Sequence, residues 1–172
     1  SYANVNLTDY TWVAIHSGKS RELASSAYDT RVRECQEGLE ILKAKYPELS
    51  SLRDAKAEYL SGNQLWEKRV RHLISENHRV QRVRGALEND NYSEAGALLT
   101  QGHKSLRDDY EVSCIELDTL VDIAQEQKSW AGGRMMGGGF GGCTINLVKR
   151  DGVDEFISVV TKKYKQHFPK LS

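Results

Sequence analysis

The sequence lacks an excess of charge of either sign, because 24 lysine and arginine residues balance 24 aspartate and glutamate residues in a chain of 172. A balanced chain offers no basic field for nonspecific binding to nucleic acid. Its apolar runs are far shorter than the ~20 residues that a membrane span needs. The first residues, Ser1-Tyr2-Ala3-Asn4, also lack the basic and apolar regions of a signal peptide. We therefore expect neither nucleic acid nor a membrane as a partner.

Cysteine and histidine are sparse, and their spacing argues against several kinds of site. Cys35, Cys114 and Cys143 are widely separated, form no C-x-x-C pair and fit a reducing, cytoplasmic compartment. None of the five histidines lies four residues from another, as a helical metal site would require. The G-x-S-x-G elbow of serine hydrolases is absent as well. We expect no metal ion held by this sequence and no complete catalytic set within it.

Hydrophobic periodicity predicts a chain dominated by helices. Apolar residues recur at steps of three and four, as one face of a helix requires, over 28–46, 65–87, 93–106, 114–127 and 153–168. A short helix is expected near 52–57, and apolar runs at 12–15 and 144–148 predict buried strands. Together these segments favour a single α+β domain over residues 1–172, with a small antiparallel sheet packed with several helices.

The same patterns predict which side chains are buried and which are solvated. The first helix would end before Pro47 and bury one apolar stripe: Tyr28, Val32, Cys35, Leu39, Leu42 and Tyr46. The charged side of segment 65–87 is interpreted as a solvated face without a binding role. Asp108, Asp109 and Glu111 are interpreted in the same way, as a solvated helix end.

The run Gly132–Cys143 is the most informative part of the chain, because it holds seven of the 14 glycines. Glycine costs backbone entropy, so such a cluster implies positive φ angles or a very close approach of another backbone or a ligand. The context differs from Rossmann and Walker A loops, because the run leads into a strand and no Gly-Lys-Ser/Thr follows. The spacing is compatible with a tight glycine hairpin and with a phosphate-facing loop.

Three segments resemble a known family of kinases. Residues 21–35 read R-x-L-A-S-S-x-Y-x-x-R-x-x-E-C, and residues 103–121 read H-x-S-L-R-D-D-Y-E-V-S-C-x-E-L-D-x-L-V. Both resemble segments of galactokinases and their close relatives. Residues 133–143, G-R-M-x-G-G-G-F-G-G-C, resemble a motif of the wider GHMP kinases, which include homoserine, mevalonate and phosphomevalonate kinases. The matches occur in the family's order and span residues 11–168.

This resemblance implies a fold and an activity. The chain would have the ferredoxin-like α+β fold of the GHMP-kinase C-terminal domain, as a truncated piece without the N-terminal half. In galactokinases that half carries the phosphate loop, the magnesium ligands and the catalytic aspartate. The implied reaction is ATP- and Mg²⁺-dependent phosphorylation of galactose at its anomeric hydroxyl, and the isolated chain would be inactive. The missing N-terminal domain would be a partner, and the surface that it leaves exposed would allow self-association.

The resemblance transfers few functional residues to this sequence, and none of them is catalytic. Tyr28 matches the tyrosine whose hydroxyl contacts galactose, with a core position at the helix start as the alternative. Five glycines match the loop that lies near the substrate and nucleotide phosphates and supports the phosphate loop of the other domain. They are Gly137, Gly138, Gly139, Gly141 and Gly142. Arg21 and Arg134 match arginines near the cleft, with a structural ion pair as the alternative to a phosphate contact.

Other functions stay compatible with the sequence. A noncatalytic galactose- and ATP-binding regulator of the same fold, or an N-acetylgalactosamine kinase, would differ mainly in the half that is not part of this sequence. A stand-alone interaction module is a further alternative. Exposed apolar surface where a second domain would sit favours the two-domain hypotheses over that module.

Overall fold

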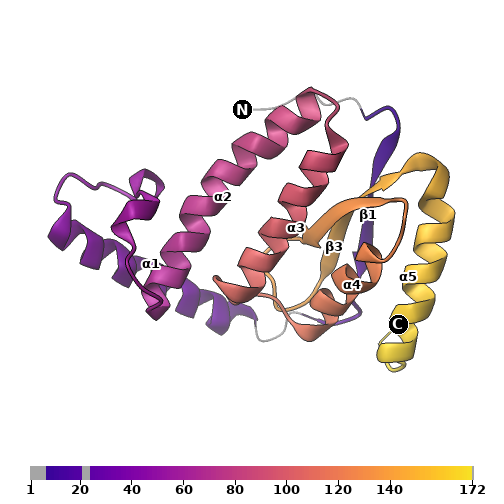
Figure 1. Cartoon of the computed structure of the whole chain (residues 1–172). Coiled ribbons are helices and arrows are strands. Elements are labelled where there is room, and N and C mark those ends of the chain that lie inside the picture. Colours follow the sequence, from indigo (N-terminus) through magenta and orange to yellow (C-terminus); the bar gives the residue numbers. More distant parts are fainter. Residues whose placement is uncertain (1–6, 21–23, 172) are drawn as a thin grey trace.

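The computed structural model describes residues 7–20 and 24–171. In chain order its main elements are β1 (Tyr10–His16), α1 (Ala24–Lys45), α2 (Leu65–Glu88), α3 (Tyr92–Asp108), α4 (Ile115–Gln125), β2 (Trp130–Met135), β3 (Cys143–Lys149) and α5 (Val153–His167) (Figure 1). The five long helices and the two strands expected from periodicity are confirmed. The short helix expected near 52–57 is instead a pair of 3₁₀ turns, η1 (Leu52–Asp54) and η2 (Ala57–Tyr59). A third 3₁₀ turn, η3 (Arg150–Gly152), connects β3 to α5.

The strands form one antiparallel sheet in the order β1-β3-β2, which confirms the predicted small antiparallel sheet. Asn146 lies fully buried at its centre. Its Nδ2 donates to the Val13 carbonyl at 3.2 Å, and its Oδ1 accepts from Trp130 Nε1 at 2.9 Å. These bonds join side chains or backbone of all three strands, so a buried amide is satisfied where an unpaired one would be costly.

Helices cover both faces of the sheet. Leu147 and Val148 are neighbours on β3 and therefore point to opposite faces. Val148 belongs to a core cluster with side chains of α4 and α5, among them Leu120 and Phe156. Leu147 belongs to a second cluster, with Ala95 and other side chains from α3 and the end of α2. The sheet is therefore the centre of the fold, with α5 on the far side from α2 and α3 (Figure 1).

Backbone meets backbone where α3 crosses β2. A Cβ atom added to Gly96 would overlap the Ala131 carbonyl, and one added to Gly132 would overlap the Gly96 backbone. Part of the glycine run therefore serves close packing of a helix on a strand. Gly132 and the residues up to Met135 lie in β2, which pairs with β3, so this part of the run fits the glycine hairpin.

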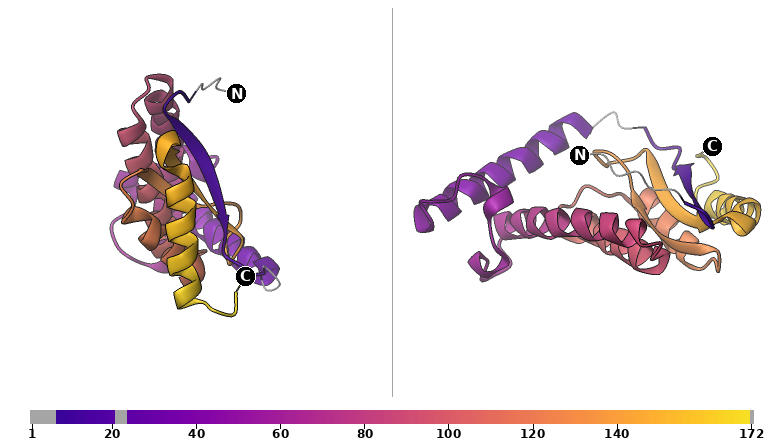
Figure 2. Two further views of the ribbon diagram at one scale, coloured as in Figure 1. Left: turned by 90° about the vertical axis from the view of Figure 1, so that its right-hand side faces the viewer. Right: turned by 90° about the horizontal axis from the view of Figure 1, so that it is seen from above.

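A separate lobe lies at the end of α1 (Figure 1), where Leu42, Leu49, Ala55, Val70 and Ile74 form their own buried cluster. Toward its start, α1 separates from α2 (Figure 2). There the predicted stripe is wrong: Tyr28 is 46% and Val32 49% exposed, whereas Leu42 farther along the stripe is fully buried. Periodicity predicted the helix correctly, but no neighbouring element covers the first half of its apolar face.

The charged side of α2 is also less solvated than predicted. Glu67 is 3% and Arg69 1% exposed, because α2 lies between α1 and α3. Glu67 accepts backbone N–H groups of Ser61, Gly62 and Gln64 at 2.8–3.0 Å and so fixes the turn before the helix. Those bonds lower the pKa of Glu67 below its usual value.

Candidate functional site

The glycine loop, residues 136–142, connects β2 to β3 through an unusual backbone. Positive φ angles occur at Gly137 (81°), Gly139 (87°), Gly141 (139°) and Gly142 (87°), and Phe140 also has a φ of 60°. Residues other than glycine rarely adopt such φ angles, so the backbone path of the loop requires glycine at these positions. Phe140 is held in the same strained region by the contacts around it.

Those contacts anchor the second half of the loop to the domain. The Phe140 N–H donates to the Val112 carbonyl at 2.8 Å, and the Phe140 side chain packs against the cluster around Val112 and Met135. The Gly142 N–H donates to the Lys19 carbonyl at 3.3 Å. A Cβ atom on Gly139 would overlap the Val112 carbonyl. This half of the loop is therefore buried and fixed.

The first half of the loop is exposed and faces Tyr28. Gly137 and Gly138 are exposed. A Cβ atom on Gly138 would meet one described atom within 4 Å, Tyr28 Cδ2 at 3.9 Å, and its φ angle is not positive. The structure thus brings together Tyr28 and the glycine loop, which are more than a hundred residues apart in sequence. An exposed phenol and exposed bare backbone therefore lie next to each other at the surface.

Arg134 lies on β2 and points to α2, where its guanidinium pairs with Glu76, which also pairs with Arg79. Burial opposes ionisation of Glu76, but the hydrogen bond from Arg134 holds the pKa of that carboxyl below its usual range. Arg134 therefore links the strand before the glycine loop to the longest helix. Arg21, the other predicted arginine, lies outside the described residues.

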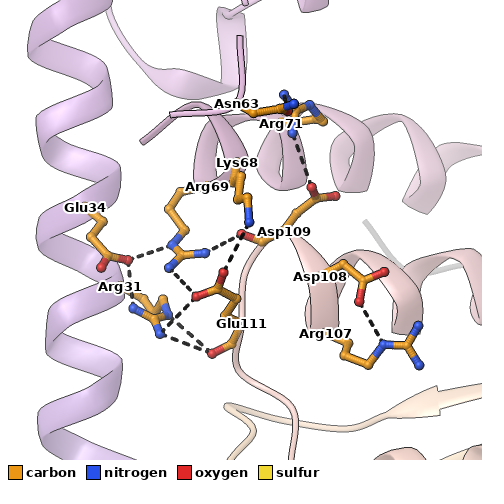
Figure 3. Close-up of polar contacts among 10 residues, drawn as sticks. All are labelled: Arg31, Glu34, Asn63, Lys68, Arg69, Arg71, Arg107, Asp108, Asp109 and Glu111. Atoms are coloured by element: carbon orange, nitrogen blue, oxygen red, sulfur yellow. Dashed lines mark hydrogen bonds and ion pairs between the residues drawn. The ribbon is translucent and has the colours of Figure 1, made fainter. Parts of the chain in front are cut away.

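An ion-pair cluster surrounds the buried side chain of Arg69 (Figure 3). Its Nε donates to Glu34 Oε2 on α1 at 2.6 Å, and its Nη2 donates to Glu111 Oε2 at 2.9 Å. Its Nη1 donates to the Asp109 carbonyl at 2.6 Å. From α1, Arg31 reaches both Glu34 Oε2 at 2.8 Å and the Glu111 carbonyl at 3.3 Å. The hydrogen bond from Arg69 lowers the pKa of Glu111, so this carboxyl is ionised at neutral pH.

This cluster corrects the interpretation of Asp108, Asp109 and Glu111 as a solvated helix end. Asp108 does lie at the surface and pairs with Arg107 and Lys104, but Asp109 and Glu111 accept hydrogen bonds from the buried Arg69. Glu111 has a φ of 53°, a strained angle that its bonds to two arginines hold in place. The spacing of three residues is compatible with the ion pair Arg31–Glu34 within one helix. The sequence around Arg69 does not indicate that it joins this pair, because Arg69 lies on another helix.

A second polar group supports the end of β2. His103 is buried on α3, and its Nδ1 accepts the Met135 N–H at 3.2 Å. Its Nε2 therefore carries the proton of the neutral ring and lies 3.2 Å from Asp118 Oδ1. Ser113 Oγ donates to the same carboxylate oxygen at 2.5 Å. The Asp118 carboxylate lies between His103 and Ser113, so the imidazole does not contact the serine hydroxyl and cannot take its proton. The arrangement therefore holds the end of β2 in place and does not activate Ser113 as a nucleophile.

Among the described residues, no group of three or more histidine, cysteine, aspartate or glutamate side chains is placed to hold a metal ion. The site offers a tyrosine hydroxyl and open backbone but no positioned base. Phosphoryl transfer needs electrostatic clamps, metal ligands and such a base, so this surface is at most one side of an active site.

Comparison with known proteins identifies the domain. The family model for the C-terminal part of the GHMP kinases matches residues 83–166, which include α3, α4, the glycine loop and most of α5. The crystal structure of Lactococcus lactis galactokinase complexed with galactose superposes with a TM-score of 0.88 and 36% identity over 97% of the chain. The chain is therefore similar to the C-terminal part of the GHMP kinases. Its fold is the one expected for the C-terminal domain of that family.

Galactokinases are among the curated proteins to which the chain is similar. The chain is 43% identical over 171 residues to the galactokinase of Clostridium acetobutylicum and 42% identical over 164 residues to that of Enterococcus faecalis. It spans 44% and 42% of those proteins, and 44% of the Lactococcus lactis chain. Leishmania major mevalonate kinase in complex with R-mevalonate, at 20% identity and a TM-score of 0.57, shares the fold alone.

Proposed function

We propose that the chain is the C-terminal domain of a galactokinase, which transfers the γ-phosphate of ATP to the anomeric hydroxyl of galactose. The observation that carries the proposal is the exposed Tyr28 beside the exposed glycines, on a domain similar to a solved galactokinase complexed with galactose. A phenol can both donate and accept a hydrogen bond, as a sugar hydroxyl requires. Exposed backbone at Gly137 and Gly138 lets anionic oxygens approach without steric obstruction.

The remaining machinery belongs to the part of the relatives that this chain does not span. ATP and Mg²⁺ would be bound mainly there, since the described residues contain no group of metal ligands. The chain by itself would therefore be inactive. Three free cysteines also support a cytoplasmic location, where thiols stay reduced. No helix among the described residues is long and apolar enough to span a bilayer.

A chimera tests the proposal. The region of Clostridium acetobutylicum galactokinase that matches this chain would be replaced by the chain, and ADP release would be measured with ATP, Mg²⁺ and galactose. We expect no turnover by the isolated chain and galactose-dependent turnover by the chimera. Turnover by the isolated chain would mean that a catalytic base has been overlooked here.

Alternative functions predict other results. A folded chimera that phosphorylates N-acetylgalactosamine in preference to galactose would favour the kinase for that sugar. A folded chimera that binds galactose and ATP without turnover would favour the noncatalytic regulator. Tyr28→Phe in the chimera is the internal control, because it removes the hydroxyl assigned to the sugar and leaves the ring.

A further inference from the structure

The cluster around Arg69 connects the two sides of the candidate site. One side is α1, which carries Tyr28 and, two turns later, Glu34. The other side is segment 109–112, which follows α3 and accepts the N–H of Phe140 through the Val112 carbonyl at 2.8 Å. Arg69 donates to both sides, to Glu34 at 2.6 Å and to the Asp109 carbonyl and Glu111 at 2.6 and 2.9 Å (Figure 3).

We propose that Arg69 is a positioning residue, which sets the distance between Tyr28 and the glycine loop by clamping α1 and segment 109–112 to α2. This inference rests on the proposed function for its consequence in catalysis, but the geometry of the clamp does not depend on it. Arg69 itself is buried and is not part of the exposed surface formed by Tyr28 and the glycines. Its effect on the sugar would therefore be indirect, through Tyr28 and the glycine loop.

The burial and chemistry of Arg69 fit such a role. Only 1% of its side chain is exposed, and its three N–H directions reach three different acceptors. A planar guanidinium holds acceptors at fixed angles, whereas a lysine ammonium at the same place offers one point charge. Removing one member of a buried ion pair leaves its partners unpaired. The backbone at Glu111, which has a strained φ angle, would then relax to a more favourable conformation and move Val112, the next residue.

The first half of α1 has few other contacts that would fix it. None of the described side chains in residues 26–37 is fully buried, and Tyr28 and Val32 are about half exposed. Besides Arg69, Arg31 contacts the Glu111 carbonyl at 3.3–3.4 Å, and the Cys35 thiol donates a long hydrogen bond of 4.0 Å to the Tyr110 hydroxyl. Arg31 also shares Glu34 Oε2 with Arg69. Loss of Arg69 therefore removes its own contacts and also disturbs the contact that Arg31 makes.

The test compares Arg69→Lys and Arg69→Met with a matched control, Arg82→Met. Arg82 lies on the same helix, is 60% exposed and pairs with Glu94, so its loss also removes one ion pair. In the chimera, we expect Arg69→Lys to raise the KM for galactose about tenfold, while the KM for ATP stays within about twofold of the parent. A purely structural role would lower kcat through a smaller active fraction and leave both KM values unchanged, which would overturn the proposal.

Hydrogen exchange on the isolated chain tests the clamp without reference to galactose. We expect faster exchange in residues 27–37 and at the Phe140 amide in Arg69→Lys, at a denaturant concentration where its global stability matches that of Arg82→Met. Unchanged exchange in both segments would contradict the proposal. If the parent chimera shows no galactokinase activity but the exchange result holds, the proposed function fails and the clamp stands.

Discussion

At the scale of single residues, Tyr28 carries the most direct test of the sugar site. Its hydroxyl is assigned to galactose, and its ring lies near Gly138. We expect Tyr28→Phe in the chimera to raise the KM for galactose roughly three- to tenfold, since one hydrogen bond contributes about 0.5–1.5 kcal/mol.

Tyr59→Phe is the matched control for that substitution. Tyr59 stacks on Tyr46 in the separate lobe, with ring centroids 3.8 Å apart. Tyr46 lies 18 residues along the chain from Tyr28, which is about 27 Å at the rise of an α-helix. Steady-state kinetics should show no change for Tyr59→Phe, and an equal change in both variants would remove Tyr28 from the sugar site.

The two halves of the glycine loop should respond differently to an added methyl group. Gly139→Ala places a Cβ atom into the Val112 carbonyl at a φ of 87°, so we expect a loss of roughly 1–3 kcal/mol in the free energy of unfolding. Gly138→Ala has neither problem, and its unfolding free energy should change by less than about 0.5 kcal/mol. Urea unfolding of both variants measures this difference, and equal losses would contradict the division of the loop.

His72 gives the domain a pH dependence below neutrality. It is buried against Ser105 and Tyr110, and burial lowers its pKa to about 4 from an ordinary value of 6.5. Below pH 6.5 this histidine takes up a proton in the unfolded chain but not in the folded one. The free energy of unfolding therefore decreases as the pH is lowered from 7 toward 4. The loss from this residue should reach about 2 kcal/mol at pH 5.

Urea midpoints at pH 7 and pH 5 check this expectation. His72→Gln should reduce the difference between the two midpoints, because it removes the group that titrates differently in the two states. His78→Gln is the control, since His78 lies exposed on the same helix. An undiminished difference in His72→Gln would show that other groups cause the acid sensitivity.

At the scale of secondary structure, α1 joins two different environments. Its second half packs in the lobe cluster, where Leu42 is fully buried, whereas its first half exposes Tyr28 and Val32. We expect amides in residues 27–35 of the isolated chain to exchange at least tenfold faster than those in 39–45, because fewer buried contacts oppose local opening. Mass spectrometry after timed labelling in D₂O measures both segments, and equal protection would contradict it.

The five long helices and the strands β1 and β3 were predictable from sequence because each depends on local periodicity and local stop signals, whereas the glycine-rich β2 has no such pattern. Pro47, for example, ends α1 two residues earlier, at Lys45, as its missing N–H and its effect on the preceding residue require. The burial of α1 and α2 was not predictable, because it depends on which other elements lie beside them. Nothing in the sequence singled out Arg69, because its partners Glu34 and Glu111 are brought to it only by the fold.

The sequence likewise identified the exposed residues of the candidate site but not the contacts that support them. A motif resemblance named Tyr28 and the glycines, and the structure places them side by side. Their functional roles stay predictions. What the sequence could not supply was the support behind them, since His103, Asp118 and Arg69 act through contacts between residues 15 to 42 positions apart.

At the scale of the whole molecule, the exposed apolar surface on α1 predicts self-association. Tyr28 and Val32 lie one helical turn apart and are both about half exposed. In sedimentation velocity at high concentration, we expect the isolated chain to form dimers or larger species, and Val32→Ser to reduce that fraction several-fold.

Val80→Ser is the control for this experiment. Val80 is 56% exposed on α2, so the substitution removes the same side chain from another surface. Equal reductions in both variants, or a chain that stays monomeric, would exclude the start of α1 as the contact. In the chimera the same surface should be covered, and self-association should disappear.

The order of strands in the sheet has a consequence for protein synthesis. β1 leaves the ribosome well before its neighbour β3, because Val13 pairs with Asn146, 133 residues later. At translation rates of about 5–20 residues per second, that interval lasts roughly 7–27 s. During that time the nascent β1, with Trp12 and its backbone edge unpaired, is available to chaperones and to neighbouring nascent chains on the same messenger RNA.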